Sequence, residues 1–156
     1  MSKPEFIYVT YIETTPEQLW HALTDGDFTE RYWFAHRAAS DWKVGSSYQF
    51  TLDGEKRLEG KVLISEPPRK LAYSWNGCSE EVRRERTSRV TFELEPRGKV
   101  VKLTLTHDNL DEAGVTHRGI AEGWPMVLAN LKSLLETGRP LPNDVRTSAA
   151  KEEISA

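Results

Sequence analysis

The last apolar stretch of this 156-residue chain has helical spacing, whereas most apolar stretches before it alternate. Ile120, Trp124, Leu128, Leu131 and Leu135 follow one another at intervals of three or four residues, which places them on one face of a helix. A helix of this kind must bury its apolar face against another layer. Together with the alternating segments, it predicts an α+β domain in which a long C-terminal helix closes over a sheet.

Glycine and proline residues set the expected bounds of this helix. The pattern predicts a helix over residues 116–137, with Gly138 as its C-cap and Pro140 preventing continuation. Pro125 lies inside the pattern, and proline in a helix interior removes a backbone hydrogen bond. Pro125 therefore implies either a kink or a later helix start, near Gly123.

The preceding segments show the two-residue alternation of half-buried strands. They cover residues 6–12, 48–52, 58–64, 71–75, 88–94 and 101–107. Turn signals separate several of them, at Asp53-Gly54, Asn76-Gly77 and Pro96-Arg97-Gly98. Short alternating segments with turns between them predict an antiparallel meander with one apolar face.

Two short helices are expected after the first strand. Thr15 as N-cap, Pro16 at the first helical position and Gln18 three residues after the cap start the first one. Asp25-Gly26 ends it, and Asp27 is expected to cap a second helix over residues 28–34. Segments 35–41 and 78–86 are expected to be loops. Residues 1–138 then form a single domain, and residues 139–156 a mobile tail.

Composition excludes several classes of protein. The formal net charge of −3 argues against a broad nucleic-acid-binding surface, and no apolar run approaches the roughly 20 residues of a membrane span. A single cysteine, Cys78, and an N-terminus without a signal-peptide pattern indicate a reducing, cytoplasmic setting. Neither a cysteine pair nor histidines at metal-ligand spacing are present, and no phosphate-binding glycine loop is found. No metal or cofactor is therefore predicted.

Seven motifs occur in the order in which a known superfamily has them. They lie at residues 15–25 (TPEQLWHALTD), 42–48 (WKVGSSY), 60–63 (GKVL), 66–71 (EPPRKL), 73–75 (YSW), 101–107 (VKLTLTH) and 123–136 (GWPMVLANLKSLLE). With these motifs, the chain resembles the START/Bet v 1-like (SRPBCC) superfamily. More narrowly, it resembles the branch named after the C-terminal domain of the activator of the heat-shock-protein-ninety ATPase.

The resemblance implies the helix-grip fold, a curved antiparallel sheet wrapped around a long C-terminal helix. Relatives in this superfamily include ligand carriers, lipid-transfer domains, aromatases and cyclases, and the chaperone activator itself. The resemblance therefore implies an architecture but names no substrate.

A sheet wrapped around a helix encloses space, and the inward residues are apolar and aromatic. The expected ligand-binding residues are Tyr8, Trp33, Trp42, Phe50, Trp75, Phe92, Leu103, His107, Trp124 and Leu128. Such a lining is typical of a small-molecule site. The alternative is a filled core without a cavity, because aromatic side chains occupy large volumes. Of these residues, Trp33, Trp42 and Trp124 are expected to control access to the cavity.

His107 is the ionisable residue that alternation directs inward. It would serve either as a structural histidine, bonded to backbone or to the segment Asp108-Asn109-Leu110, or as an acid or base. In the second case Tyr8, Tyr48 or Tyr73 would assist it.

Three functions remain open from the sequence. The first is a noncatalytic binding module for a small, mainly hydrophobic molecule. The predicted aromatic interior and the lack of a catalytic constellation suggest it. The second is a chaperone-interacting domain, and the third is a cyclase-like acid–base enzyme that uses His107. The chain is expected to be a monomer or a weak homodimer.

Overall fold

The structure, a computed structural model, describes residues 5–112 and 114–142. Within these residues, seven strands form one antiparallel sheet in the order β1-β7-β6-β5-β4-β3-β2. The strands are β1 (Phe6–Ile12), β2 (Arg37–Ser40), β3 (Ser47–Leu52), β4 (Glu55–Glu66), β5 (Lys70–Gly77), β6 (Ser88–Arg97) and β7 (Val100–Asp108). The helices are α1 (Pro16–Thr24), α2 (Gly26–Tyr32), α3 (Glu80–Arg83) and α4 (Val115–Thr137).

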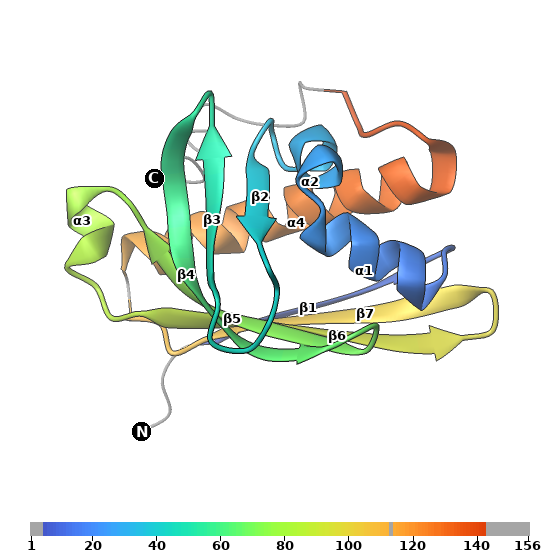
Figure 1. Cartoon of the computed structure of the whole chain (residues 1–156), viewed down its shortest axis with the longest axis horizontal. Helices are drawn as coiled ribbons and strands as arrows, with labels where there is room; N and C mark the ends of the chain where they lie inside the picture. Colours follow the sequence, from blue (N-terminus) through green and yellow to red (C-terminus); the bar gives the residue numbers. More distant parts are fainter. Residues whose placement is uncertain (1–4, 113, 143–156) are drawn as a thin grey trace.

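The sheet is strongly curved, and α4 lies along its inner side. In Figure 1, β1, β6 and β7 run along the bottom while β2, β3 and β4 stand upright, and α4 crosses the space that they enclose. The short helices α1 and α2 cover the right-hand part of the same side. This is the α+β helix-grip arrangement that the sequence predicts.

Helix α4 begins one residue before the predicted start and continues through Pro125 to Thr137. The predicted C-cap is confirmed, because Gly138 adopts the left-handed conformation (φ 85°) and donates its N–H to the carbonyl of Leu134. The expected apolar face is buried, with Trp124, Leu128 and Leu131 each at most 2% exposed. The later start near Gly123 is therefore wrong.

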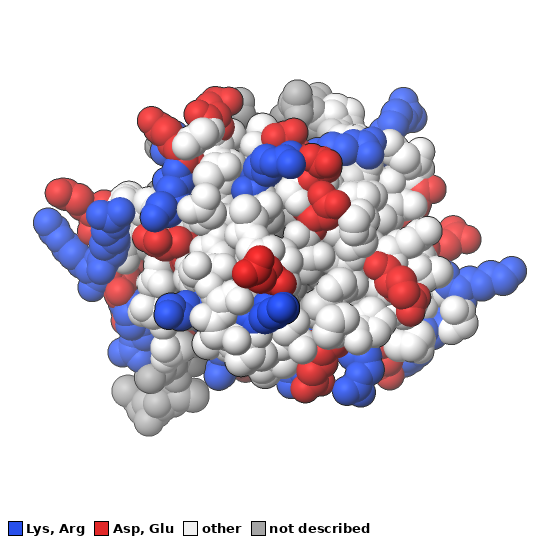
Figure 2. Space-filling model, in the orientation of Figure 1, with Lys and Arg blue, Asp and Glu red and all other residues white. Residues whose placement is uncertain are grey.

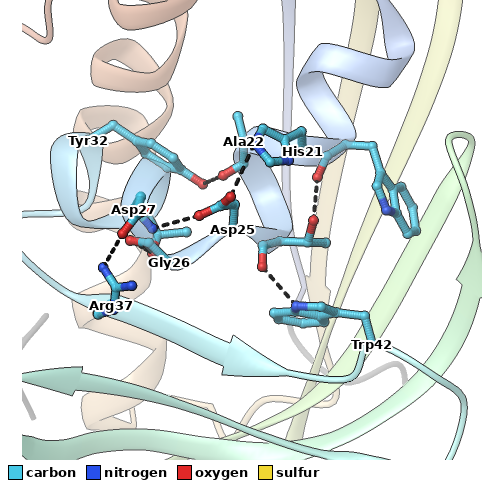
Figure 3. A network of polar contacts seen from close by, with 11 residues as sticks. His21, Ala22, Asp25, Gly26, Asp27, Tyr32, Arg37 and Trp42 are labelled. Carbon is cyan, nitrogen blue, oxygen red and sulfur yellow. Dashed lines mark hydrogen bonds and ion pairs between the residues drawn. The ribbon is translucent and has the colours of Figure 1, made fainter.

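The corner between α1 and α2 differs from the prediction. Asp25, rather than Asp27, caps α2, because the Asp25 carboxylate accepts from the backbone N–H of Asp27 at 2.7 Å. The same carboxylate pairs with His21 at 3.1 Å, and Asp27 pairs with Arg37 (Figure 3). Asp25 thus ends α1 with its backbone N–H, which is donated to the His21 carbonyl, and starts α2 with its carboxylate. Helix α2 ends at Tyr32 because Phe34 and Ala35 have positive φ angles.

Both segments predicted to be loops contain secondary structure. Residues 35–41 contain β2, whose four residues pair with β3 along one edge of the sheet. Residues 78–86 contain the single turn of α3, capped by the Ser79 hydroxyl. The predicted turn at Asn76-Gly77 is also wrong, because both residues continue β5 and pair with β4. The predicted mobile tail lies mostly outside the described residues.

Candidate functional site

An apolar pocket lies where the first half of α4 meets α3, the β3–β4 hairpin and the end of α2. Figure 1 shows α3 and the first half of α4 on the left. Its apolar walls include Trp33, Phe50, Leu58, Trp75, Val82, Ile120, Trp124 and Val127, and its polar side chains are His36, Arg57 and Thr116. An apolar concave surface with a few polar groups is the usual form of a small-molecule site.

Three tryptophans form much of the pocket wall. The ring of Trp33 lies 5.1 Å from that of Trp124 and 6.2 Å from that of Trp75, and Trp75 and Trp124 are 5.4 Å apart. Phe50 packs against Trp33 with ring centroids 4.6 Å apart. These separations are those of favourable aromatic pairs, so the cluster is stable without a ligand.

The aromatic cluster leaves limited free space. The centre of a water-sized sphere can explore about 50 Å³ of the pocket. One water needs roughly 10–15 Å³ on this measure, so the space suits a few waters. Pockets for drug-sized ligands hold roughly 300–1,000 Å³. The sequence left open a ligand cavity or a filled core. The interior has features of both, because it is mostly filled and keeps a small cavity near α3.

His107 lies behind this wall and is completely buried. The indole N–H of Trp124 donates to Nδ1 of His107 at 3.0 Å, and Nε2 lies 2.8 Å from the hydroxyl oxygen of Ser88. Because an indole nitrogen only donates, Nδ1 must be the unprotonated nitrogen. The proton of the neutral imidazole is then on Nε2 and is donated to Ser88. Burial also lowers the pKa of His107 to about 3, so the neutral form prevails at neutral pH.

These bonds bear on the possible roles of His107. A base that activates Ser88 would have to accept the hydroxyl proton at Nε2, but Nε2 is the protonated nitrogen in this arrangement. Its hydrogen bonds in the described part of the chain go to Ser88 and Trp124, and not to a tyrosine. The expected bond to backbone or to the segment Asp108-Asn109-Leu110 is wrong, since the two ring nitrogens of His107 bond to Trp124 and Ser88 instead. The geometry favours a structural histidine that holds Trp124 in place.

The predicted binding residues occupy several distinct places. Trp33, Phe50, Trp75 and Trp124 line the pocket. Phe92, Leu103 and Leu128 are buried in the core, and Phe92 supports the Trp124 ring at 5.8 Å. Tyr8 is half-buried on β1, where it stacks on Phe6.

Trp42 lies outside the pocket. Its indole N–H donates to the carbonyl of Thr24 at 2.8 Å, and its ring stacks on Tyr48. Figure 3 shows this bond at the end of α1, next to the contacts of Asp25 and Asp27. The position of Trp42 suits the attachment of α1 to the sheet rather than control of access to the pocket.

Sequence reasoning missed Arg57, whose side chain lines the pocket together with Leu58. Strict alternation would direct these neighbours to opposite faces. The pairing of β3 with β4 shifts between Phe50, opposite Leu58, and Thr51, opposite Lys56. Arg57 is therefore the extra residue of a β-bulge, and bulges redirect side chains. His36 was expected in a loop, but it is buried, and its Nδ1 bonds to the Trp33 carbonyl at 2.9 Å.

The charged residues give the surface a mixed character. Figure 2 shows acidic and basic side chains interspersed on the face drawn there. The arginine-rich stretch before and within β6 is partly paired, with Arg86 bonded to Asp111 and Arg89 to Asp108. Within residues 5–112 and 114–142, no group of three His, Cys, Asp or Glu side chains is arranged to hold a metal ion. No helix in the same residues is both long and apolar enough to cross a membrane.

The fold is that of the SRPBCC superfamily. Within it, the family model described as Activator of Hsp90 ATPase homolog 1-like protein matches residues 13–136. The chain belongs to this family. A comparison with curated proteins gave no match.

Solved structures agree with this assignment. A protein from Mesorhizobium loti is 27% identical with a TM-score of 0.74, over 85% of this chain and 96% of the other. An HSP90 activator from Plasmodium falciparum is 25% identical with a TM-score of 0.71, over 84% and 95%. An Aha1 dimer from Colwellia psychrerythraea is 24% identical with a TM-score of 0.72, over 86% and 98%, and shows likeness of fold alone.

Proposed function

We propose that this protein is a small-molecule-binding module whose ligand enters the tryptophan-lined pocket between α3 and α4. The observation that carries the proposal is the apolar wall that Trp33, Trp75 and Trp124 form along the pocket. Burial of an apolar ligand against such a wall is favourable by about 25 cal/mol per Å² of apolar area. The ligand is small and mainly hydrophobic.

The segment that contains α3 covers one side of the pocket, and its movement would enlarge the cavity. Val82 of α3 lines the pocket. Polar contacts then attach the residues after α3 to the start of α4: the Glu85 carboxylate accepts from the backbone N–H groups of Val115 and Thr116, and Arg86 pairs with Asp111. Because these contacts lie outside the ladders of the sheet, the segment can move without unpairing strands. Its displacement would admit ligands larger than the closed cavity.

The test uses the five tryptophans as internal probes. Small aromatic and aliphatic compounds of benzene to naphthalene size are titrated into ¹⁵N-labelled protein. We expect the indole N–H signals of Trp33, Trp75 and Trp124 to shift in a saturable manner, whereas those of Trp20 and Trp42 stay unchanged, because only the first three line the pocket. Absence of any saturable shift across the panel contradicts the proposal.

A matched pair of variants locates the binding. Ile120 lies in the pocket wall, so Ile120→Phe fills free space and should weaken binding. Leu63 is exposed on β4, and Leu63→Phe adds the same ring outside the pocket. Equal affinities of the two folded variants would place the ligand elsewhere.

Family membership and the 25% identical Plasmodium falciparum protein, described as an HSP90 activator, support a second candidate function, chaperone interaction. A candidate contact surface is the outer face of β1, where Ile7, Val9 and Tyr11 are about half exposed. The test measures Hsp90 ATPase turnover with increasing amounts of the protein. Stimulation that Val9→Lys abolishes and Ile120→Phe leaves intact would support a chaperone role through this face. No stimulation and no binding would reject it.

A further inference from the structure

Arg57 brings a positive charge to a pocket lined mainly by apolar side chains. The described lining contains neither Asp nor Glu, and Arg57 is its one Lys or Arg side chain. The charge is present because the β-bulge turns Arg57 toward the side of the sheet that Leu58 already faces. A regular β4 would have directed Arg57 away from the pocket.

The Arg57 guanidinium also holds a donor that the protein does not use. Its Nε is buried and has no hydrogen-bond partner among the described residues. A buried donor without an acceptor is unfavourable, so binding of a ligand that supplies an acceptor would be favourable. Nη2, on the same edge of the guanidinium, pairs with the Glu55 carboxylate at 3.2 Å.

This edge suits a carboxylate. The Nε–H and Nη2–H groups are parallel donors, and a planar carboxylate can accept from both at once. The present partner is readily displaced, since Glu55 is 73% exposed and exposed ion pairs contribute little. A ligand carboxylate can therefore take over Nη2 and satisfy Nε in the same step.

We propose that the ligand of this pocket is a small monocarboxylic acid, with its carboxylate on Arg57 and its apolar body against the tryptophan wall. This inference rests on the proposed function of the pocket and names the chemical class of its ligand. A single guanidinium matches one negative charge, so the class is a monocarboxylate rather than a phosphate dianion.

The first experiment varies the ligand and leaves the protein unchanged. Phenylacetate and hexanoate are compared with phenylacetamide and hexanamide, which have the same apolar bodies without the charge. We expect the acids to bind the wild-type protein about tenfold more tightly than the amides, as for a charge-assisted bidentate contact. Equal affinities would overturn the inference, and so would tighter binding of phenyl phosphate than of phenylacetate.

The second experiment varies the guanidinium. Arg57→Gln should reduce the preference for acids over amides to about twofold or less while the amides bind as before, because the charge and the paired donors are lost. Arg57→Lys should retain part of the preference, because it keeps the charge but lacks the two parallel N–H donors of the guanidinium. The control is Arg69→Gln, which removes an exposed arginine paired with Glu66, outside the pocket. An unchanged preference in Arg57→Gln would overturn the inference.

Failure of this inference and failure of the proposed function are distinguishable. If acids and amides bind equally and Ile120→Phe weakens both, the pocket binds small molecules but Arg57 does not select them. If neither series shifts the indole signals of Trp33, Trp75 and Trp124, the pocket function itself fails. Should Arg57→Gln not fold, the acid-to-amide comparison on the wild-type protein still decides the question.

Discussion

Trp124 donates its indole N–H to Nδ1 of His107 at 3.0 Å, in a bond that joins α4 to β7. Both residues are buried, and His107 forms a second hydrogen bond, to Ser88 of β6. The helix is thus fixed to the sheet at the point where Trp124 enters the pocket wall. The position of the tryptophan cluster depends on this bond.

Trp124→Phe should therefore destabilise the protein. The substitution keeps an aromatic ring but removes the donor, so Nδ1 of His107 is left buried without a partner. We expect a loss of about 1–3 kcal/mol in the free energy of unfolding, the usual cost of an unsatisfied buried polar group. Urea unfolding followed by circular dichroism measures it. Wild-type stability in this variant would mean that the bond contributes nothing.

The buried state of His107 also predicts a pH dependence. Burial lowers its pKa in the folded protein to about 3, whereas an unfolded chain has the ordinary value of about 6.5. Between these values the unfolded state binds a proton that the folded state does not bind. The stability contributed by this group is complete above about pH 6.5 and decreases as the pH falls toward 3, by about 1.4 kcal/mol per pH unit.

Comparison with a variant isolates this contribution from the carboxylates. His107→Asn removes the titrating group, so the wild-type free energy of unfolding should decrease more steeply between pH 6.5 and 4.5 than that of the variant. His21→Asn is the control, because His21 is more than half exposed. Parallel stability curves for wild type and His107→Asn would show that His107 is not held neutral in the fold.

The inward position of His107 was predictable because β7 is regular. It lies between β1 and β6, and Val101, Leu103, Leu105 and His107 alternate without a register shift. The partners of His107 were not predictable, because Ser88 and Trp124 come from distant positions in the chain. The bounds of α4 were predictable to within one residue, because its apolar face, Gly138 and Pro140 are local signals.

Arg57 shows where sequence reasoning ends. A β-bulge is a property of two paired strands, so the alternation of β4 alone cannot reveal which residue is the extra one. The four residues of β2 were missed for a related reason. Arg37–Ser40 is too short to show a reliable period, and its strand character comes from pairing with β3.

The start of α4 depends on a residue from another element. The N-cap Gly114 has no side chain to cap the helix, and the Glu85 carboxylate accepts from the N–H groups of Val115 at 2.7 Å and Thr116 at 3.2 Å instead. A negative charge at a helix N-terminus is also favoured by the helix dipole. Glu85→Gln should lower the free energy of unfolding by about 0.5–2 kcal/mol, the range of lost N-caps.

Hydrogen exchange distinguishes this local effect from a general one. In Glu85→Gln the amides of Val115 and Thr116 should exchange faster, whereas those in the second half of α4 should change little. The control variant is Glu122→Gln, an exposed position in the same helix beyond its first turn. Unchanged protection of Val115 and Thr116 in Glu85→Gln would contradict the capping role.

Gly60 is required by close packing between β3, β4 and β5. A Cβ on Gly60 would lie 2.7 Å from Cε2 of Tyr48 and closer still to the backbone oxygen of Ser74. Neither neighbour can easily move away, because the Tyr48 hydroxyl donates to that same oxygen at 2.6 Å and Tyr48 is buried. Gly60→Ala should therefore force the strands apart and cost about 1–3 kcal/mol in the free energy of unfolding, as overpacking does.

Gly98→Ala is a suitable comparison. Among the described residues, no atom other than those of Gly98 and its two chain neighbours lies within 4 Å of the added Cβ, so the positive φ (64°) is what opposes the substitution, at about 1–2 kcal/mol. Both variants are measured by urea unfolding, and the amides of Lys61 and Ser74 report on strand separation by hydrogen exchange. We expect their protection to decrease in Gly60→Ala and to remain unchanged in Gly98→Ala, since only the first substitution disturbs the contact between β4 and β5. Retained protection together with wild-type stability in Gly60→Ala would show that the strands tolerate the extra methyl group.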